Sequence, residues 1–126
     1  MNAPMMMLTG AAAKEDKTTS KTFNELVPTP GQGFTTSQKA TITALFVAEC
    51  RVSASTERLE VRIMVDNTVA DPGDVVLTMT NKYETRCHLG FKTAVPAGSH
   101  NITVYWRVSG GTGYVRNRSF TVWQVS

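Results

Sequence analysis

Residues 95–125 read VPAGSHNITVYWRVSGGTGYVRNRSFTVWQV and contain two alternating segments separated by a glycine-rich loop. Every second residue from Ile102 to Val108 is apolar, and this period of two is typical of a half-buried strand. A second alternating segment covers residues 114–125. The stretch is therefore predicted to be a hairpin that closes the domain, with Trp106 and Trp123 supplying large apolar surfaces to the core.

Five further strands are predicted upstream of this hairpin, separated by turn signals such as Asp71-Pro72-Gly73-Asp74. They are residues 40–52, 59–65, 68–70, 75–79 and 83–92. About seven short strands without a helical stripe indicate an all-β protein, an antiparallel β-sandwich. Both cysteines precede both tryptophans, unlike the Cys, Trp, Cys order of immunoglobulin domains, so a jelly-roll-like sandwich is preferred.

The alternation also predicts which side chains face the core. In residues 40–52 the even-numbered positions form the buried face, and Leu45 and Val47 on the other face suggest a strand covered on both sides. In residues 59–65 the buried positions are predicted to be Leu59, Val61, Ile63 and Val65. In the next long strand the predicted buried face is Tyr83, Thr85, Cys87, Leu89 and Phe91.

The first part of the chain differs in composition from the rest. Residues 1–33 are predicted to be an extended N-terminal arm followed by a Pro and Gly linker, and residues 34–126 to be the sandwich domain. The arm is either free or laid along the edge of the domain. Its apolar run, Met5, Met6, Met7 and Leu8, is either a flexible plug for a groove on a partner or part of a loose tail.

Composition argues against two classes of partner. The chain carries 13 Lys and Arg residues and 10 Asp and Glu residues, and a net charge of +3 is small for a nucleic-acid binder. The apolar run at Met5 is short and no basic residue precedes it, which argues against a signal peptide. No stretch is long and apolar enough for a membrane-spanning helix, so we expect neither nucleic acid nor membrane as partner.

The sequence offers no set of catalytic residues. His88 and His100 have no predicted serine and carboxylate partners, and the strand carboxylates Glu49, Glu60 and Glu84 are expected to pair with Arg51, Arg62 and Arg86. Cys50 and Cys87 fit no metal spacing and are predicted to be buried free thiols, with a disulfide as the alternative. We expect no enzyme, no cofactor and no metal site.

Four side chains of the predicted hairpin are candidates for a binding surface. Tyr105 and Arg107 are predicted to share the solvent face with Arg116 and Arg118 across the hairpin. Tyr and Arg are enriched at protein interfaces, where they give large contact areas and directed hydrogen bonds. The alternative is an ordinary mixed strand face.

The same stretch resembles the closing hairpin of small β-sandwich structural proteins of tailed bacteriophages. The resemblance is carried by the turn Ala97–His100, the strand and loop Tyr105–Gly113 and the return strand Val115–Val122. It implies a virion structural protein, most like the capsid decoration (cement) proteins. Such a protein is made in the host cytoplasm, binds the major capsid protein on the outside of the phage head and acts as a homotrimer.

The resemblance also extends to tail fibres and carbohydrate-binding modules. The alternative function is therefore a tail-fibre or receptor-binding module, in which Tyr83, Tyr114 or Trp123 stack on sugar rings.

Overall fold

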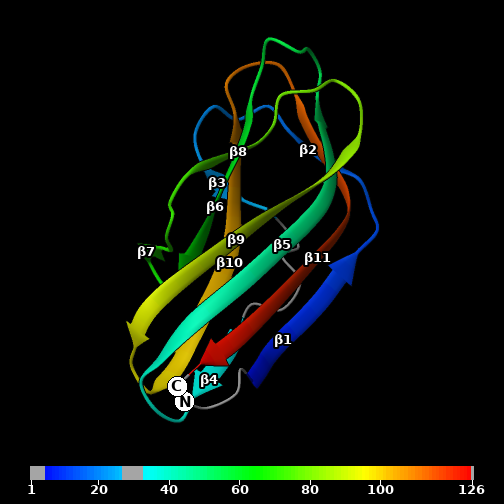
Figure 1. Ribbon diagram of the computed structural model, residues 1–126. Coiled ribbons are helices and arrows are strands. Elements are labelled where there is room, and N and C mark those ends of the chain that lie inside the picture. Colours follow the sequence, from blue (N-terminus) through cyan, green and yellow to red (C-terminus); the bar gives the residue numbers. More distant parts are fainter. Residues whose placement is uncertain (1–4, 27–32, 126) are drawn as a thin grey trace.

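Two antiparallel sheets stacked face to face make up the protein (Figure 1). The computed structural model describes residues 5–26 and 33–125, and these residues contain strands and turns but no helix. The predicted all-β sandwich is confirmed. No helix that could cross a membrane is found in the described part of the chain.

The β5 sheet, named after its long central strand, has five strands. Its order is β1 (Met5–Ala12), β11 (Gly113–Val125), β5 (Ala40–Val52) and β9 (Glu84–Val95), and β2 (Asp16–Thr18) pairs with the other end of β11. The first and last strands of the chain are therefore neighbours, blue beside red in Figure 1.

The β10 sheet has six strands, of which β10 (Gly98–Val108) is the longest. Its order is β3 (Asn24–Glu25), β10, β6 (Leu59–Val65) and β7 (Thr68–Val69), while β4 (Gly33–Thr36) pairs with β10 and β8 (Val75–Thr78) pairs with β6. All seven strands expected from the sequence are present as β5 to β11. The four additional strands, β1 to β4, all lie between residues 5 and 36.

The core between the sheets follows the predicted alternation in three strands. The even-numbered residues of β5 from Ala40 to Val52, the odd-numbered residues of β6 and the even-numbered residues of β10 from Ile102 to Val108 are all buried. Trp106 is 3% exposed, whereas Trp123 is only half-buried and lies on the outer face of the β5 sheet. The prediction that both tryptophans fill the core is therefore wrong for Trp123.

The last two strands are not a hairpin, which corrects the sequence interpretation. β10 pairs with β6 and β11 pairs with β5, so the loop between them carries the chain from one sheet to the other. Gly113, where β11 begins, is buried, and a Cβ there would lie 2.6 Å from Val108 Cγ1 and 2.9 Å from Leu59 Cδ1. Gly113 therefore allows the chain to pass closely from the β10 sheet to the β5 sheet, and the glycine-rich loop is not a tight turn within one sheet.

The two faces of β9 are also the reverse of the prediction. His88 and Gly90 are buried, whereas Cys87, Leu89 and Phe91 are exposed. The register decides this, because His88 lies opposite the inward-facing Phe46 of β5. A Cβ at position 90 would lie 3.0 Å from Ile63 Cδ1, so the narrow space between the sheets accepts glycine there.

The N-terminal segment lies along both sheets. β1 and β2 extend the β5 sheet beyond β11, and β3 pairs with β10. A bulge between Met6 and Leu8 leaves Met7 and Leu8 partly buried against the core. Most of the predicted linker, residues 28–32, lies outside the described residues.

Candidate functional site: the outer face of the β5 sheet

The outer face of the β5 sheet carries three complete rows of uncharged side chains. The rows, each read across β1, β11, β5 and β9, are Met6, Trp123, Thr43 and Phe91; Thr9, Thr121, Leu45 and Leu89; and Ala11, Ser119, Val47 and Cys87. We call these twelve residues the uncharged face. Thr9 and Thr121 approach each other to 3.4 Å between their hydroxyl oxygens, as expected for side chains on one face.

Large apolar side chains of the uncharged face are open to solvent. Met6 is 58% exposed, Leu89 54% and Phe91 42%, while Leu45, Val47 and Trp123 are half-buried. No described residue outside the sheet packs over Leu89 or Phe91 enough to bury it. Contiguous exposed apolar surface of this kind marks an interaction site more often than isolated apolar residues do.

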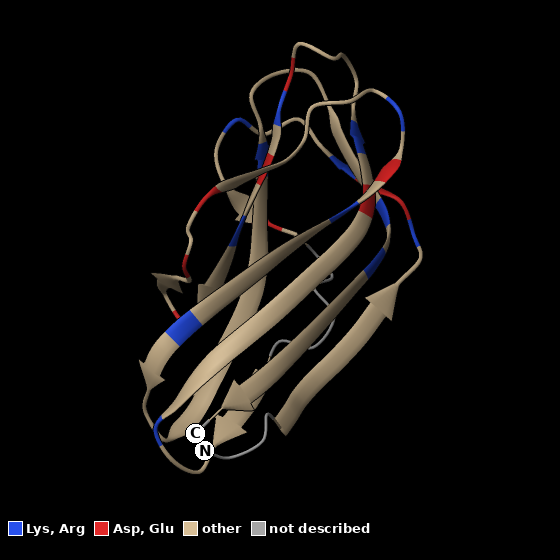
Figure 2. Cartoon of the chain, in the orientation of Figure 1, with Lys and Arg blue, Asp and Glu red and all other residues tan. Residues whose placement is uncertain are grey.

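Charged side chains begin at one end of this face (Figure 2). Lys92 of β9 does not belong to it, because Lys92 lies in register with the inward-facing Ile42. Beyond the third row, Arg116 pairs with Glu49 at 2.9 Å, and Asn117 donates to the same carboxylate oxygen at 2.7 Å. These hydrogen bonds, that of Asn117 first, lower the pKa of Glu49.

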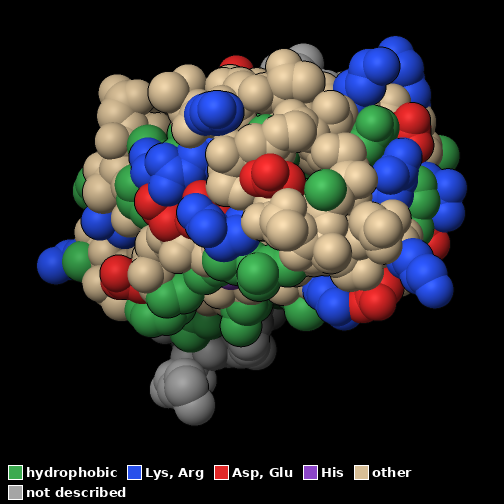
Figure 3. All heavy atoms as spheres, turned by 90° about the horizontal axis from the view of Figure 1, so that it is seen from above, with side chains coloured by type: hydrophobic (Ala, Val, Ile, Leu, Met, Phe, Trp, Pro, Cys, Tyr) green, Lys and Arg blue, Asp and Glu red, His purple; other side chains and the backbone are tan. Residues whose placement is uncertain are grey.

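Arginine and tyrosine side chains stack at this charged end. The guanidinium carbon of Arg51 lies 3.8 Å from the ring centre of Tyr114, and that of Arg116 lies 3.7 Å from the ring centre of Tyr83. The Tyr83 hydroxyl donates to Glu15, and its pKa is raised by burial and by this carboxylate. Figure 3 views the molecule from this end, where positive and negative side chains are scattered among the loops.

The outer face of the β10 sheet is built differently, because the N-terminal segment partly covers it. Phe23 contacts both Arg62 and Arg107, whose guanidinium carbons lie 3.8 Å and 4.2 Å from its ring centre. Arg107 also donates to Glu60 at 3.0 Å. Arg107 is therefore held in place by an ion pair and by the ring of Phe23, and its side chain is still 33% exposed.

A polar hollow of about 250 Å³ opens beside this cluster. Its lining residues are Glu25, Asp66, Asn67, Asn101, Thr103 and Tyr105. They come from β3, the turn between β6 and β7, and the solvent side of β10. One aromatic ring among amide, carboxylate and hydroxyl groups is a composition suited to a polar small molecule.

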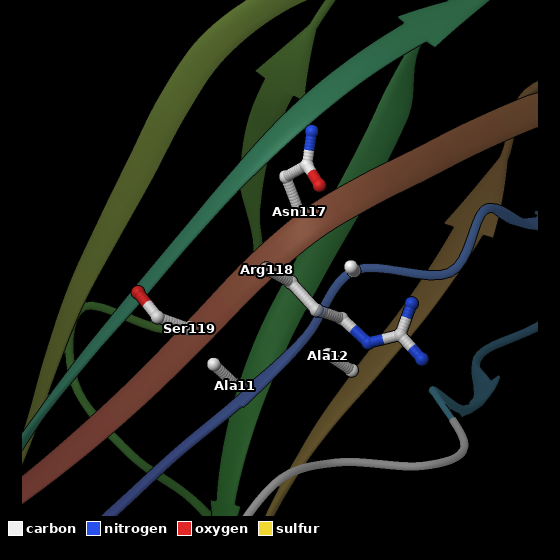
Figure 4. Close-up of a pocket in the computed structure, with 6 residues that line it drawn as sticks. Ala11, Ala12, Asn117, Arg118 and Ser119 are labelled. Carbon is white, nitrogen blue, oxygen red and sulfur yellow. The ribbon is translucent and has the colours of Figure 1, made fainter.

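Arg118 is buried, contrary to its predicted place on a solvent face. A bulge between Arg116 and Ser119, with Asn117 at a φ of 48°, turns the Arg118 side chain away from Asn117 (Figure 4). Its side chain is 0% exposed and donates to Asp16 Oδ2 at 2.7 Å and to the Lys14 carbonyl at 3.4 Å. A shallow pocket beside it is lined by Ala11, Ala12, Ala13, Asn117, Arg118 and Ser119.

The predicted binding residues do not form one surface. Tyr105 and Arg107 lie on the β10 sheet, whereas Arg116 and Arg118 lie on the β5 sheet, because β10 and β11 are in different layers. Of the predicted apolar plug, Met5 and Met6 are exposed and lie on β1, and Met7 and Leu8 pack against the core. The sequence interpretation missed the uncharged face, although the outward Leu45 and Val47 were a signal for it.

The carboxylates on the strands are paired with arginines. Glu49, Glu60 and Glu84 each pair with an arginine, but only Glu84 pairs with one of those expected, Arg86. Arg62 instead pairs with Asp74. Within the described ranges, no three His, Cys, Asp or Glu side chains are placed to hold a metal ion.

The two histidines have opposite environments. Both ring nitrogens of His100 face oxygen acceptors, with Nδ1 2.8 Å from Asp66 Oδ2 and Nε2 2.7 Å from the Pro96 carbonyl, an arrangement that suits the doubly protonated ring. The Asp66 hydrogen bond accordingly raises the pKa of His100. His88 is buried, its Nε2 has no hydrogen-bond partner among the described atoms, and burial lowers its pKa.

The cysteines are both free thiols, but only one is buried. Cys50 faces the core, and burial raises its pKa to about 12. Cys87 is exposed in the third row of the uncharged face, which corrects its predicted burial.

Comparison with known proteins shows the fold and no more. No family model matches the sequence, and no curated protein is similar to it. The structure is similar to capsid protein VP2 in the subviral particle of infectious bursal disease virus, with a TM-score of 0.58, 12% identity, and coverage of 95% of this chain and 32% of VP2. This chain thus spans about a third of the length of VP2.

Two other structures share the sandwich. A 4-O-methyl-α-glucuronidase with specificity for decorated arabinogalactans has a TM-score of 0.56 and 7% identity, over 94% of this chain and 16% of the enzyme. The Eiger TNF of S. frugiperda has a TM-score of 0.50 and 9% identity, over 96% of this chain and 94% of its own. The fold thus occurs in a viral capsid protein, an enzyme and a TNF protein.

Proposed function

We propose that this chain is a non-catalytic structural protein of a virus particle, a decoration protein that binds the outside of a phage head and stabilises contacts between capsid subunits. The observation that carries the proposal is the exposed apolar surface of the β5 sheet, formed by Met5 and Met6 on β1 and by Leu89 and Phe91 on β9, which is suited to contact with other protein chains. The resemblance of residues 95–122 and the fold shared with a viral capsid protein support it. In this role the chain acts as a homotrimer whose partner is the major capsid protein.

The exposed start of β1 is the proposed contact with the capsid. Met5 is 52% exposed, and methionine adapts its flexible side chain to irregular grooves. Met7 and Leu8 pack against the core and hold β1 in place, so the proposed capsid contact involves fewer residues than the apolar run in the sequence. Tyr105, Arg107 and Arg116 remain proposed as additional contacts.

Electron microscopy of the parent particle, together with a binding assay, tests this function. We expect density for the sandwich on the outside of the head and co-sedimentation of the purified chain with stripped heads. Met5→Asp should weaken co-sedimentation, because the contact would then bury a charge, whereas Val76→Asp, at a 47% exposed position of β8, should not. Density on the tail, or equal binding by both variants, would contradict the proposal.

A second candidate function, sugar binding, is favoured by the polar hollow. Tyr105 offers a ring for stacking, and Asn67, Asn101 and Thr103 offer hydrogen-bonding groups around it. The rings of Tyr83 and Tyr114, named from the sequence for this task, are instead stacked with arginine. A glycan array on which wild type binds and Tyr105→Ala does not would favour this function over decoration.

A further inference from the structure

The uncharged face is unusual for this chain because charge is absent over all three of its rows. The chain as a whole has 13 Lys and Arg and 10 Asp and Glu residues, and none of them belongs to this face. The centres of protein interfaces are depleted in charged residues in the same way, because burying an unpaired charge is costly.

The uncharged face has the size of a small interface. Its four strands lie about 4.8 Å apart and its three rows cover about six residues of each strand at about 3.3 Å, which gives a footprint of about 350 Å². Projecting side chains make the accessible area larger than this footprint. The uncharged face is therefore smaller than the roughly 800 Å² that each partner contributes to a standard interface and has the size expected of a weak, reversible association.

The electrostatics favour a copy of the same chain over an oppositely charged partner. An uncharged surface needs no complementary charge, so copies with a net charge of +3 meet on it without like charges in contact. At its charged end the rim carries both signs, with Glu49 paired to Arg116 and Glu84 to Arg86. An acidic partner, by contrast, would be matched by an excess of basic residues that this face does not have.

From these observations we infer that the uncharged face is the surface through which copies of this chain associate in the proposed homotrimer, and that its occupant is a neighbouring copy of the chain. Leu45 and Val47, whose outward apolar side chains predict a strand covered on both sides, receive their second cover in the oligomer. The inference deepens the proposed function, in which the protein acts as an oligomer, and it rests on that proposal for its biological purpose.

Light scattering of the purified full chain tests this inference without any particle. Wild type should give a mass above that of the monomer within the range of about 1 to 100 µM. Leu89→Lys places a charge in the middle row and should weaken association at least about tenfold, equivalent to about 1.4 kcal/mol. Leu89 is 54% exposed, so the variant should keep the wild-type urea midpoint.

Val76→Lys is the matched control, since Val76 is 47% exposed but lies on β8 of the other sheet. It should associate as wild type does. Alkylation of Cys87 gives a second measurement of association, because Cys87 belongs to the uncharged face. Its alkylation rate should fall as the wild-type concentration rises, and in Leu89→Lys the same fall should need at least about tenfold higher concentration.

A wild type that stays monomeric at every concentration would overturn the inference, as would a Leu89→Lys variant of unchanged mass. The outcome is separate from that of the capsid assay. Association without binding to heads would contradict the decoration function alone, whereas head binding by a monomeric wild type would contradict the self-association surface alone.

Discussion

Arg118 is a buried charged residue, and the bulge of β11 places its side chain in this buried position. Its side chain is 0% exposed, and its ion-pair partner Asp16 comes from β2, in the N-terminal segment. A buried charge is tolerated only with a partner, so the segment before residue 23 takes part in the electrostatics of the sandwich.

We predict that Asp16→Ala lowers the free energy of unfolding by about 3 kcal/mol, because it removes the Asp16 carboxylate from the buried Arg118 guanidinium. Urea unfolding followed by tryptophan fluorescence measures this loss. Glu60→Ala, which removes the partner of the more exposed Arg107, should cost no more than about 1 kcal/mol. Equal losses in the two variants would show that the burial of Arg118 has no energetic consequence.

The histidines should give the stability opposite dependences on pH. The pKa of His100 is raised, so its contribution is complete below the unfolded-state value of about 6.5 and is lost as pH rises through the folded value. The pKa of His88 is lowered, so the unfolded chain takes up the proton first and stability falls as pH drops below about 6.5.

Two variants separate these effects. Between about pH 8 and about pH 5.5, His88→Leu should gain stability relative to wild type on acidification, and His100→Gln should lose it. Chemical unfolding at the two pH values measures both changes. Parallel pH profiles for wild type and both variants would count against this assignment.

At the scale of elements, the alternation of apolar residues was sufficient to predict the buried face of β5, β6 and β10, because every second residue of β5, of β6 and of the Ile102–Val108 part of β10 faces the core. It failed for β9, because the more apolar face of this strand points outward and a glycine meets Ile63 on the inner side. Which face is buried depends on register with β5, and register is a tertiary property that a single strand does not encode.

The candidate site was less predictable than the strands for the same reason. The twelve residues of the uncharged face come from four strands, and only the pairing of the strands makes them contiguous. Leu45 and Val47 alone gave a local signal. Strands β1 to β4 lack a clear alternation of apolar residues, and they form because β10 and β11 offer backbone groups for pairing.

The crossing between β10 and β11 gives an element-scale prediction. Gly113→Ala should lower the free energy of unfolding by about 1 to 3 kcal/mol, because its Cβ would overlap Val108 and Leu59 in the core. Thermal unfolding measures the loss. Gly33→Ala is the control, since the nearest atom to its Cβ would be Asn101 Oδ1 at 4.0 Å, and its stability should match that of wild type.

At the scale of the whole molecule, the start of β1 and the end of β11 lie side by side, with Met5 opposite Gln124. The loop between β5 and β6, around Ser55, is exposed at the other end of the sandwich (Figure 1). A chain closed between residues 5 and 125 by a short flexible linker and reopened after Ser55 therefore keeps all the strand pairs.

We predict that this circular permutant folds with the circular dichroism spectrum of the wild type, because joining adjacent strand ends and opening an exposed loop disturb few contacts. A chain reopened within β5 at Phe46, which is buried, should fail to fold and serves as the comparison. Failure of the first permutant alone would indicate that the Ser53 to Glu57 loop is essential for folding.

The position of β11 between β1 and β5 also sets the order of events during protein synthesis. β1 and β2 leave the ribosome before the other strands of the sandwich, whereas β11, the strand they pair with, follows all of them. The apolar residues of β1 therefore have no partner strand until β11 has been translated. Pairing of β1 with β11 joins segments that are far apart in sequence, so we expect the closure of the β5 sheet to be slow.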